Sequence, residues 1–81
     1  MKKVLGEANF SRISVGDLIS WTEISKERRK RKGIVLKKFV VTDLDLHKER
    51  KVAMLKVVDG SENKIVNILA INAKIESKST T

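Results

Sequence analysis

Apolar and polar residues alternate in short stretches along most of the chain, from residue 18 to residue 76. An alternation with a period of two is typical of strands that bury one face and expose the other. The pattern predicts strands at 18–21, 34–41, 51–58, 64–69 and 73–76, with a single tight helical turn at 70–72. Five short strands separated by turn signals, without a convincing helix, predict an all-β fold that forms a small barrel or roll.

Two turns frame these strands. Val15-Gly16-Asp17 precedes the first strand, and it suits a turn because glycine adopts positive φ and aspartate bonds to its own backbone. Asp59-Gly60 gives the clearest hairpin turn of the chain. The second predicted strand carries apolar residues on both faces, such as Ile34 on one and Val35 on the other. This pattern predicts a strand that bends from one sheet into another.

The chain is expected to form one domain with an extension at each end. Residues 1–13 show no sustained periodicity and are predicted to be a flexible N-terminal arm, and residues 77–81 a disordered tail. Residues 14–76 would form the barrel, with a polar turn region at 42–50. The apolar runs are too short for a signal peptide or a membrane span, and the chain has no cysteine. We therefore expect a cytoplasmic protein.

Positive charge is concentrated between the first and second predicted strands. The chain has 18 Lys and Arg against 10 Asp and Glu, a formal charge of +8, and six of the seven residues from 26 to 32 are basic. Ile24 is the only apolar residue of 23–32, so no amphipathic face would hold a helix in place there. We predict a long basic loop. Its candidate nucleic-acid-binding residues are Lys26, Arg28, Arg29, Lys30, Arg31 and Lys32.

A concentrated basic loop is typical of a protein that binds a polyanion: nucleic acid, an anionic membrane surface or an acidic protein face. A loop that serves only solubility would have the same composition. Trp21, the only tryptophan, also has two interpretations. It packs over one end of the barrel, or it is a stacking platform for a base or a peptide proline beside the basic loop. Membrane binding ranks last, because the loop lacks the apolar residues of an amphipathic element.

The order of these features resembles that of the small SH3-like barrels. Val15-Gly16-Asp17-Leu18-Ile19-Ser20-Trp21 is similar to their "GD" opening strand, and Gly33-Ile34-Val35 to their "G-I-V" strand. KOW modules of ribosomal and transcription proteins share this opening, and short uncharacterised SH3-like proteins of phages and bacteria look similar. The resemblance implies a five-stranded SH3-like barrel with a long basic loop between strands 1 and 2. It departs from the SH3 domains that bind proline-rich peptides, because their groove needs more aromatic residues than this chain has.

Residues with catalytic or metal-binding chemistry are sparse. Asp43, Asp45 and His47 would share one face of a strand, but a calcium loop would need glycine where Lys48 stands. With a single histidine and no cysteine, no nucleophile has an evident base. The four glycines are scattered, so they form no phosphate-binding loop. We expect no catalysis, no metal, no cofactor and no small-molecule substrate.

Two functions follow as hypotheses. The first is a non-catalytic module that binds nucleic acid or another polyanion through the basic loop, without sequence preference. If Trp21 is exposed, it would stack on a base beside the loop. The alternative is a structural or assembly protein of a phage or bacterial type. It would act through self-association as a homo-oligomer or through contact with another protein, by adding a partner strand to a sheet edge.

Overall fold

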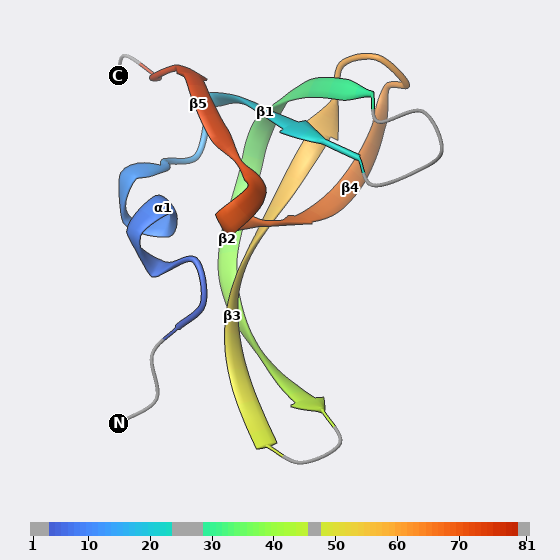
Figure 1. Cartoon of the computed structure of the whole chain (residues 1–81). Coiled ribbons are helices and arrows are strands. Elements are labelled where there is room, and N and C mark those ends of the chain that lie inside the picture. Colours follow the sequence, from blue (N-terminus) through green and yellow to red (C-terminus); the bar gives the residue numbers. More distant parts are fainter. Residues whose placement is uncertain (1–3, 24–28, 46–47, 80–81) are drawn as a thin grey trace.

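The computed structural model describes residues 4–23, 29–45 and 48–79. In these residues the chain forms five strands, one short α-helix and one 3-10 turn (Figure 1). The elements in chain order are α1 (Glu7–Arg12), β1 (Leu18–Thr22), β2 (Lys30–Asp45), β3 (Lys48–Asp59), β4 (Lys64–Leu69), η1 (Ala70–Asn72) and β5 (Lys74–Ser77). The predicted all-β class is confirmed, as are the tight turn at 70–72 and the strand at 64–69.

The strands form one antiparallel sheet in the order β4-β3-β2-β1-β5. The sheet bends strongly, and β2 and β3 form a long curved hairpin that extends beyond the other strands (Figure 1). Its hydrogen-bond ladder does not close, because β4 and β5 lie at the two edges of the sheet. Over the described residues, the predicted barrel or roll is thus a single bent antiparallel sheet of five strands whose ladder is open.

The inner face of this sheet holds the core. Ile19 and Trp21 of β1 and Val35 of β2 pack with Leu55 and Val57 of β3. The period of two explains why these residues form the core, since each strand places alternate side chains on the inner face. Burying such side chains provides the main driving force for folding.

Gly33 permits the close approach of β2 to its neighbours. A Cβ at this position would lie 2.4 Å from both Val57 Cγ1 and the Val58 carbonyl oxygen, and 3.1 Å from the Trp21 ring. No side chain fits there, so the strand needs glycine at the point where Trp21 crosses beneath it.

A β-bulge divides β2 into two parts. Val35 pairs with Val57, but the next pair joins Lys37 to Lys56, so Leu36 is an extra residue in the ladder. A bulge bends its strand and changes the face on which the following residues lie. Ile34 and Lys37 therefore share the outer face, although they are three residues apart. The bulge moves the inward-facing positions of β2 from odd residues, such as Val35, to even residues, such as Lys38, which pairs with the buried Leu55.

The central hairpin is longer than predicted. Residues 42–50 were expected to form a polar turn region, but β2 continues to Asp45 and β3 begins at Lys48. Thr42 pairs with Lys51 in a continuous antiparallel register. Backbone hydrogen bonds to a neighbouring strand extend a strand whatever the polarity of its side chains, and composition alone does not reveal such pairing.

The N-terminal segment contains a helix that the sequence pattern did not predict. Asn9 Nδ2 donates hydrogen bonds to the carbonyl oxygens of Ala70 (3.1 Å) and Ala73 (3.2 Å), which ties α1 to η1. Lys38 Nζ donates to the Phe10 (3.0 Å) and Ile13 (2.8 Å) carbonyls at the end of the helix. A six-residue helix does not form by propensity alone, so these tertiary contacts decide its structure.

Asp17 joins the start of the sheet to the C-terminal segment. Its side chain is fully buried. Oδ2 accepts hydrogen bonds from Ser14 N (2.8 Å) and Lys78 Nζ (2.6 Å), and Oδ1 accepts one from Ser79 N (2.7 Å). Burial by itself raises the pKa of Asp17, but these donors outweigh it and lower the pKa. Residues 77–79, predicted as part of a disordered tail, thus belong to β5 or bond to Asp17, while residues 80–81 lie outside the described range.

Candidate nucleic-acid interface

The structure divides the predicted basic loop. Lys26 and Arg28 lie outside the described residues, and Arg29 is exposed directly before β2. Lys30, Arg31 and Lys32 belong to β2 itself. Because side chains alternate along a strand, the two lysines project from one face of the sheet and Arg31 from the other.

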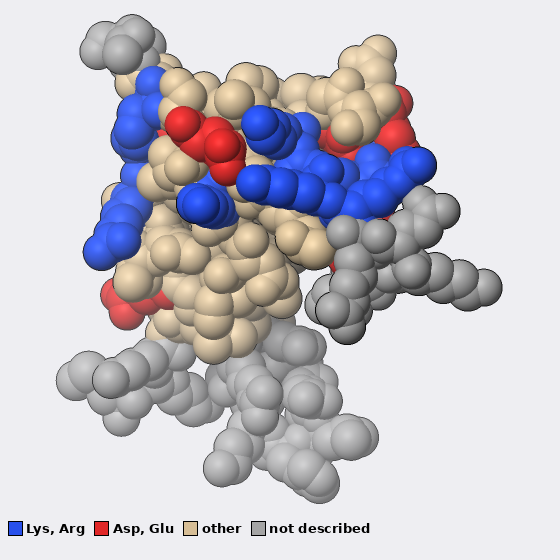
Figure 2. Space-filling view, turned by 45° about the horizontal axis from the view of Figure 1, so that its top comes forward, with Lys and Arg blue, Asp and Glu red and all other residues tan. Residues whose placement is uncertain are grey.

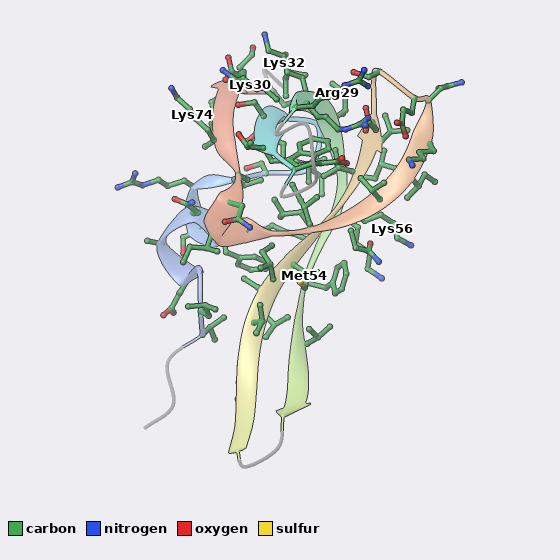
Figure 3. The ribbon with its side chains drawn as sticks, turned by 45° about the vertical axis from the view of Figure 1, so that its right-hand side comes forward. Arg29, Lys30, Lys32, Met54, Lys56 and Lys74 are labelled. Carbon is green, nitrogen blue, oxygen red and sulfur yellow. The ribbon has the colours of Figure 1, made fainter. Side chains whose placement is uncertain are left out.

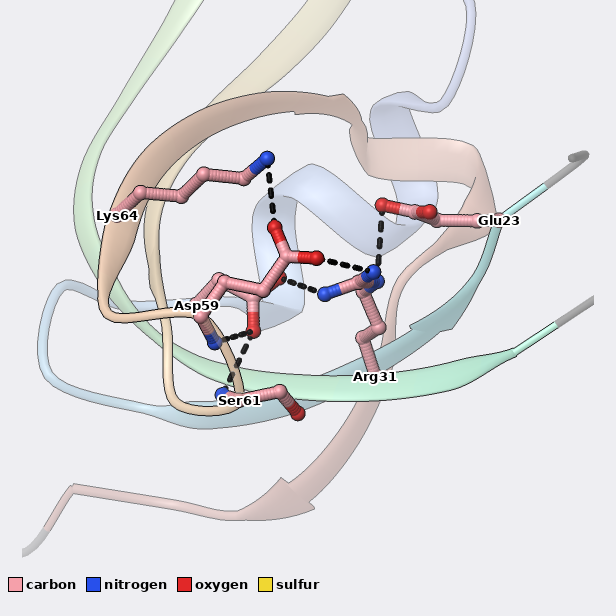
Figure 4. A network of polar contacts seen from close by, with 6 residues as sticks. Glu23, Arg31, Asp59, Ser61 and Lys64 are labelled. Atoms are coloured by element: carbon pink, nitrogen blue, oxygen red, sulfur yellow. Dashed lines mark hydrogen bonds and ion pairs between the residues drawn. The ribbon is translucent and has the colours of Figure 1, made fainter.

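Arg31 lies in an ionic network whose centre is buried and whose rim is partly exposed. It is 7% exposed, and its guanidinium contacts three carboxylates (Figure 4). Nη1 lies 2.8 Å from Asp59 Oδ2, Nη2 lies 2.8 Å from Glu62 Oε1, and Nε lies 2.9 Å from Glu23 Oε1. The hydrogen bond with Glu62 is the largest of the effects that raise the pKa of Arg31, so it stays charged.

The same network holds the turn between β3 and β4. Asp59 is fully buried, and its Oδ1 accepts a hydrogen bond from Ser61 N at 2.8 Å. Glu62 Oε2 lies 2.6 Å from Lys64 Nζ. The hydrogen bond from Lys64, followed by that from Arg31, lowers the pKa of Glu62 to about 2. Arg31, predicted as a phosphate-binding residue, is thus separated from Lys30 and Lys32 and surrounded by carboxylates.

Trp21 packs in the core and is 5% exposed. Its side chain lies on the inner face of β1, opposite the face that carries Lys30 and Lys32. It also lines a pocket of about 390 Å³, together with Thr22, Glu23 and residues of β4. The position agrees with the packing interpretation and gives no support to stacking beside the lysines.

Three lysines from two strands lie together on the outer face of the sheet. Lys32 of β2 pairs with Ser20 of β1, and Ser20 pairs on its other side with Lys74 of β5. Lys30 follows on the same face of β2, paired with Thr22. Lys30, Lys32 and Lys74 are called the basic face below. All three are exposed, and Figure 3 shows them gathered at one end of the molecule near Arg29.

One carboxylate lies among these lysines. Glu76 Oε2 accepts a hydrogen bond from Ser20 Oγ at 2.7 Å and lies 3.9 Å from Lys30 Nζ. The Ser20 hydroxyl is the largest cause of the lowered pKa of Glu76, and the charges of the three lysines act in the same direction. Positive charge still exceeds negative charge here, and Lys and Arg side chains form a band across this side of the molecule (Figure 2).

Lys74 is not among the residues predicted for the site from the sequence. The alternation at 73–76 placed it on the polar face of a strand, but that pattern does not reveal which strand is the neighbour. Pairing of β5 with β1, far apart in sequence, brings Lys74 across Ser20 from Lys32.

The structure also bears on metals and membranes. Over residues 4–23, 29–45 and 48–79, His, Asp and Glu side chains form no group of three or more that could hold a metal ion. None of the helices in that part of the chain is long and apolar enough to cross a membrane.

Comparison with known proteins gives no relative for this chain. No family model matches it, and neither a curated protein nor a solved structure shows significant similarity.

Proposed function

We propose that the protein is a non-catalytic SH3-like module that binds nucleic acid through its phosphates. The observation that carries the proposal is the basic face: Lys30, Lys32 and Lys74 converge from two strands around the carboxylate of Glu76. Arg29 lies beside them, and Lys26 and Arg28 precede it in the chain, so they remain part of the proposed contact set.

The strand order supports the SH3-like part of the proposal. In small SH3-like barrels the first strand pairs with both the second and the last, and a short 3-10 turn precedes the last strand. Here β1 pairs with β2 and β5, and η1 stands between β4 and β5. The bulged, bent β2 would connect the two halves of such a barrel.

The chemistry of the basic face favours phosphate contacts over base recognition. Base stacking on a protein needs an exposed aromatic ring, and Trp21 lies on the inner side of β1. Lysine is a point charge that suits phosphate without fixing base identity. We therefore expect binding that is insensitive to sequence. Each neutralised phosphate of duplex DNA contributes about −0.9 to the slope of log K against log salt, so three lysines predict a contribution of roughly −3.

The test is fluorescence anisotropy of labelled single- and double-stranded oligonucleotides at two salt concentrations. The variant Lys30→Ser/Lys32→Ser/Lys74→Ser should weaken binding by about tenfold or more and flatten the salt dependence. Its matched control is Lys37→Ser/Lys51→Ser/Lys56→Ser, which removes the same charge from β2 and β3. An equal loss in both variants would mean that overall charge, and not the basic face, determines binding, and would reject the proposal.

Self-association is a second candidate, and one observation favours it. β1 pairs with β2 only over Lys30–Ile34, and Val35 bonds to residues 16 and 17. In the described part of the chain, residues 37–45 of β2 pair with β3 on one side and with no strand on the other. Val40 and Val41, in this segment, are 44% and 37% exposed.

An open strand edge is a template for pairing with a second copy. Two copies joined along β2 would form a continuous sheet, which light scattering after gel filtration would detect as a dimer mass. A monomer mass at every concentration would exclude this second candidate and leave the nucleic-acid proposal intact.

A further inference from the structure

Four apolar residues form a row across the outer face of the sheet. Leu18 of β1 pairs with Ile34 of β2, Ile34 pairs with Val58 of β3, and Val58 pairs with Ile65 of β4. Directly paired residues point to the same face, on strands about 4.8 Å apart. These four residues are called the apolar row below.

The apolar row does not belong to the core of the protein. Ile34 is 39% exposed and Ile65 59% exposed, while Leu18 and Val58 are half-buried. Their neighbours in sequence on the inner face, such as Val35 and Val66, pack in or against the core. Leu36, the extra residue of the bulge, is also 42% exposed. Contiguous exposed apolar side chains framed by polar residues are typical of interaction surfaces.

Lysines lie on both sides of the apolar row. On one side, Lys32 is two residues before Ile34 on the same face of β2. Lys74 of β5 lies beyond it, on the other side of Ser20 of β1. On the other side, Lys37 pairs directly with Lys56, and the bulge places Lys37 on the face of Ile34. Figure 3 shows Lys32 and Lys74 at one end of the molecule and Lys56 toward its middle.

From this arrangement we propose that the apolar row is a docking site for an acidic protein segment, one with apolar side chains at its centre and carboxylates on both sides. The apolar centre would cover Ile34 and Ile65, and the flanking carboxylates would meet the lysine pairs. Complementary charge at the rim of an apolar contact sets the orientation of a partner and its rate of association.

The flanking charges argue against two other occupants. A second copy related by a two-fold axis would place lysines opposite lysines, because an isologous contact uses the same surface on both chains. Like charges that face each other across a contact are destabilising. Nucleic acid would gain nothing from the apolar row, since phosphates do not interact favourably with isoleucine. A membrane surface normally receives Trp, Phe or Leu side chains from an amphipathic helix, whereas the row lies on strands and none of its four residues is aromatic.

Three synthetic peptides test the proposal against the full chain. The first is Ac-EEVILVEE-NH2, with an apolar centre between acidic flanks. The second, Ac-KKVILVKK-NH2, reverses the charges, and the third, Ac-EESGSGEE-NH2, removes the apolar centre. We expect the first to bind about tenfold or more tightly than either of the others. Its amide shift changes in ¹⁵N-labelled protein should centre on Leu18, Ile34, Val58 and Ile65.

Two kinds of variant locate the site. Ile34→Ser/Ile65→Ser should lower the affinity for the first peptide by about tenfold and leave the affinity for the oligonucleotide unchanged. Ile71→Ser, at an exposed isoleucine of η1, is the matched control and should leave the affinity for the peptide unchanged. Lys37→Glu/Lys56→Glu should abolish the preference for the first peptide over the second, because each peptide then has one matched and one mismatched flank. This charge reversal keeps the test decisive if the double serine variant fails to fold.

Three results would overturn the proposal. Equal affinity for the three peptides would show that neither the charge nor the apolar centre of the peptide contributes to binding. Shift changes that leave out Leu18, Ile34, Val58 and Ile65 and their sequence neighbours would place the contact elsewhere. Binding to vesicles with 30% phosphatidylserine, lost in Ile34→Ser/Ile65→Ser and accompanied by no peptide binding, would assign the row to a membrane surface. Each result is separable from the oligonucleotide experiment, which uses different substitutions and a different ligand.

Discussion

Arg31 and its neighbours Lys30 and Lys32 stand next to one another in the chain, yet the fold gives them opposite environments. Arg31 is buried against three carboxylates, with Asp59 at 0% exposure. Lys30 and Lys32 are exposed on the other face, near one carboxylate, Glu76. A run of like charges on a strand is thus two sets of residues. One set stabilises the fold, and the other is available to a partner.

This comparison predicts the largest effect for loss of Arg31. Arg31→Ala leaves the buried Asp59 carboxylate without its counter-charge, and breaking a buried ion pair costs about 3–5 kcal/mol. Urea unfolding followed by Trp21 fluorescence measures the free energy of unfolding. Lys32→Ala, one position away, should change it by no more than about 0.5 kcal/mol. Similar losses in the two variants would contradict the division of the run into two sets.

A smaller effect is expected at the second buried carboxylate. Lys78→Ala removes one of the donors to Asp17, but the backbone N–H groups of Ser14 and Ser79 remain. A hydrogen bond to a charged group contributes about 1.5–3 kcal/mol, and we expect the lower end because the Lys78 side chain is 49% exposed. Urea unfolding measures this loss, and a value as large as that of Arg31→Ala would mean that exposure does not moderate the cost.

The network around Arg31 also predicts a pH dependence. The pKa of Glu62 falls from its ordinary 4.5 to about 2 in the folded protein. A lowered folded-state pKa adds stability that is complete above pH 4.5 and is lost as the pH falls toward 2. Wild type should therefore exceed Glu62→Gln in urea midpoint at pH 7, and the difference should shrink between pH 4.5 and pH 2. If the difference in urea midpoint is constant over this range, protonation of Glu62 does not cause the pH dependence of stability.

The smallest effect concerns the basic face. Glu76→Gln removes its carboxylate while its side-chain oxygen still accepts the Ser20 hydroxyl. Affinity for a duplex oligonucleotide should rise by roughly two- to fivefold at low salt, because a like charge no longer opposes the phosphates. The free energy of unfolding is expected to change little. Unchanged affinity, measured by anisotropy, would place the phosphates away from Ser20 and Glu76.

Parts of the fold could be predicted from the sequence because they depend on local patterns. The alternation at 64–69, the Asp59-Gly60 turn and the tight turn at 70–72 all appear in the structure as predicted. The candidate site was predictable only in part. Lys30 and Lys32 lie on the surface, but Lys74 joins them through a strand pairing that no local pattern encodes. The helix at Glu7–Arg12 was missed for the same reason, since contacts from Asn9 and Lys38 hold it.

By itself, the sequence determined that the chain is built from amphipathic strands, though not how long they are, and that its charge is concentrated before Gly33. A period of two and the chemistry of Gly and Asp suffice for that, because both act over a few residues. The tertiary structure alone decided which cations lie inside and which outside. The alternation separates two faces of a strand, but the neighbouring strands determine which face is buried. Asp59, Glu62 and Glu23 come from other parts of the chain to surround Arg31, and this arrangement assigns it to the fold rather than to the surface.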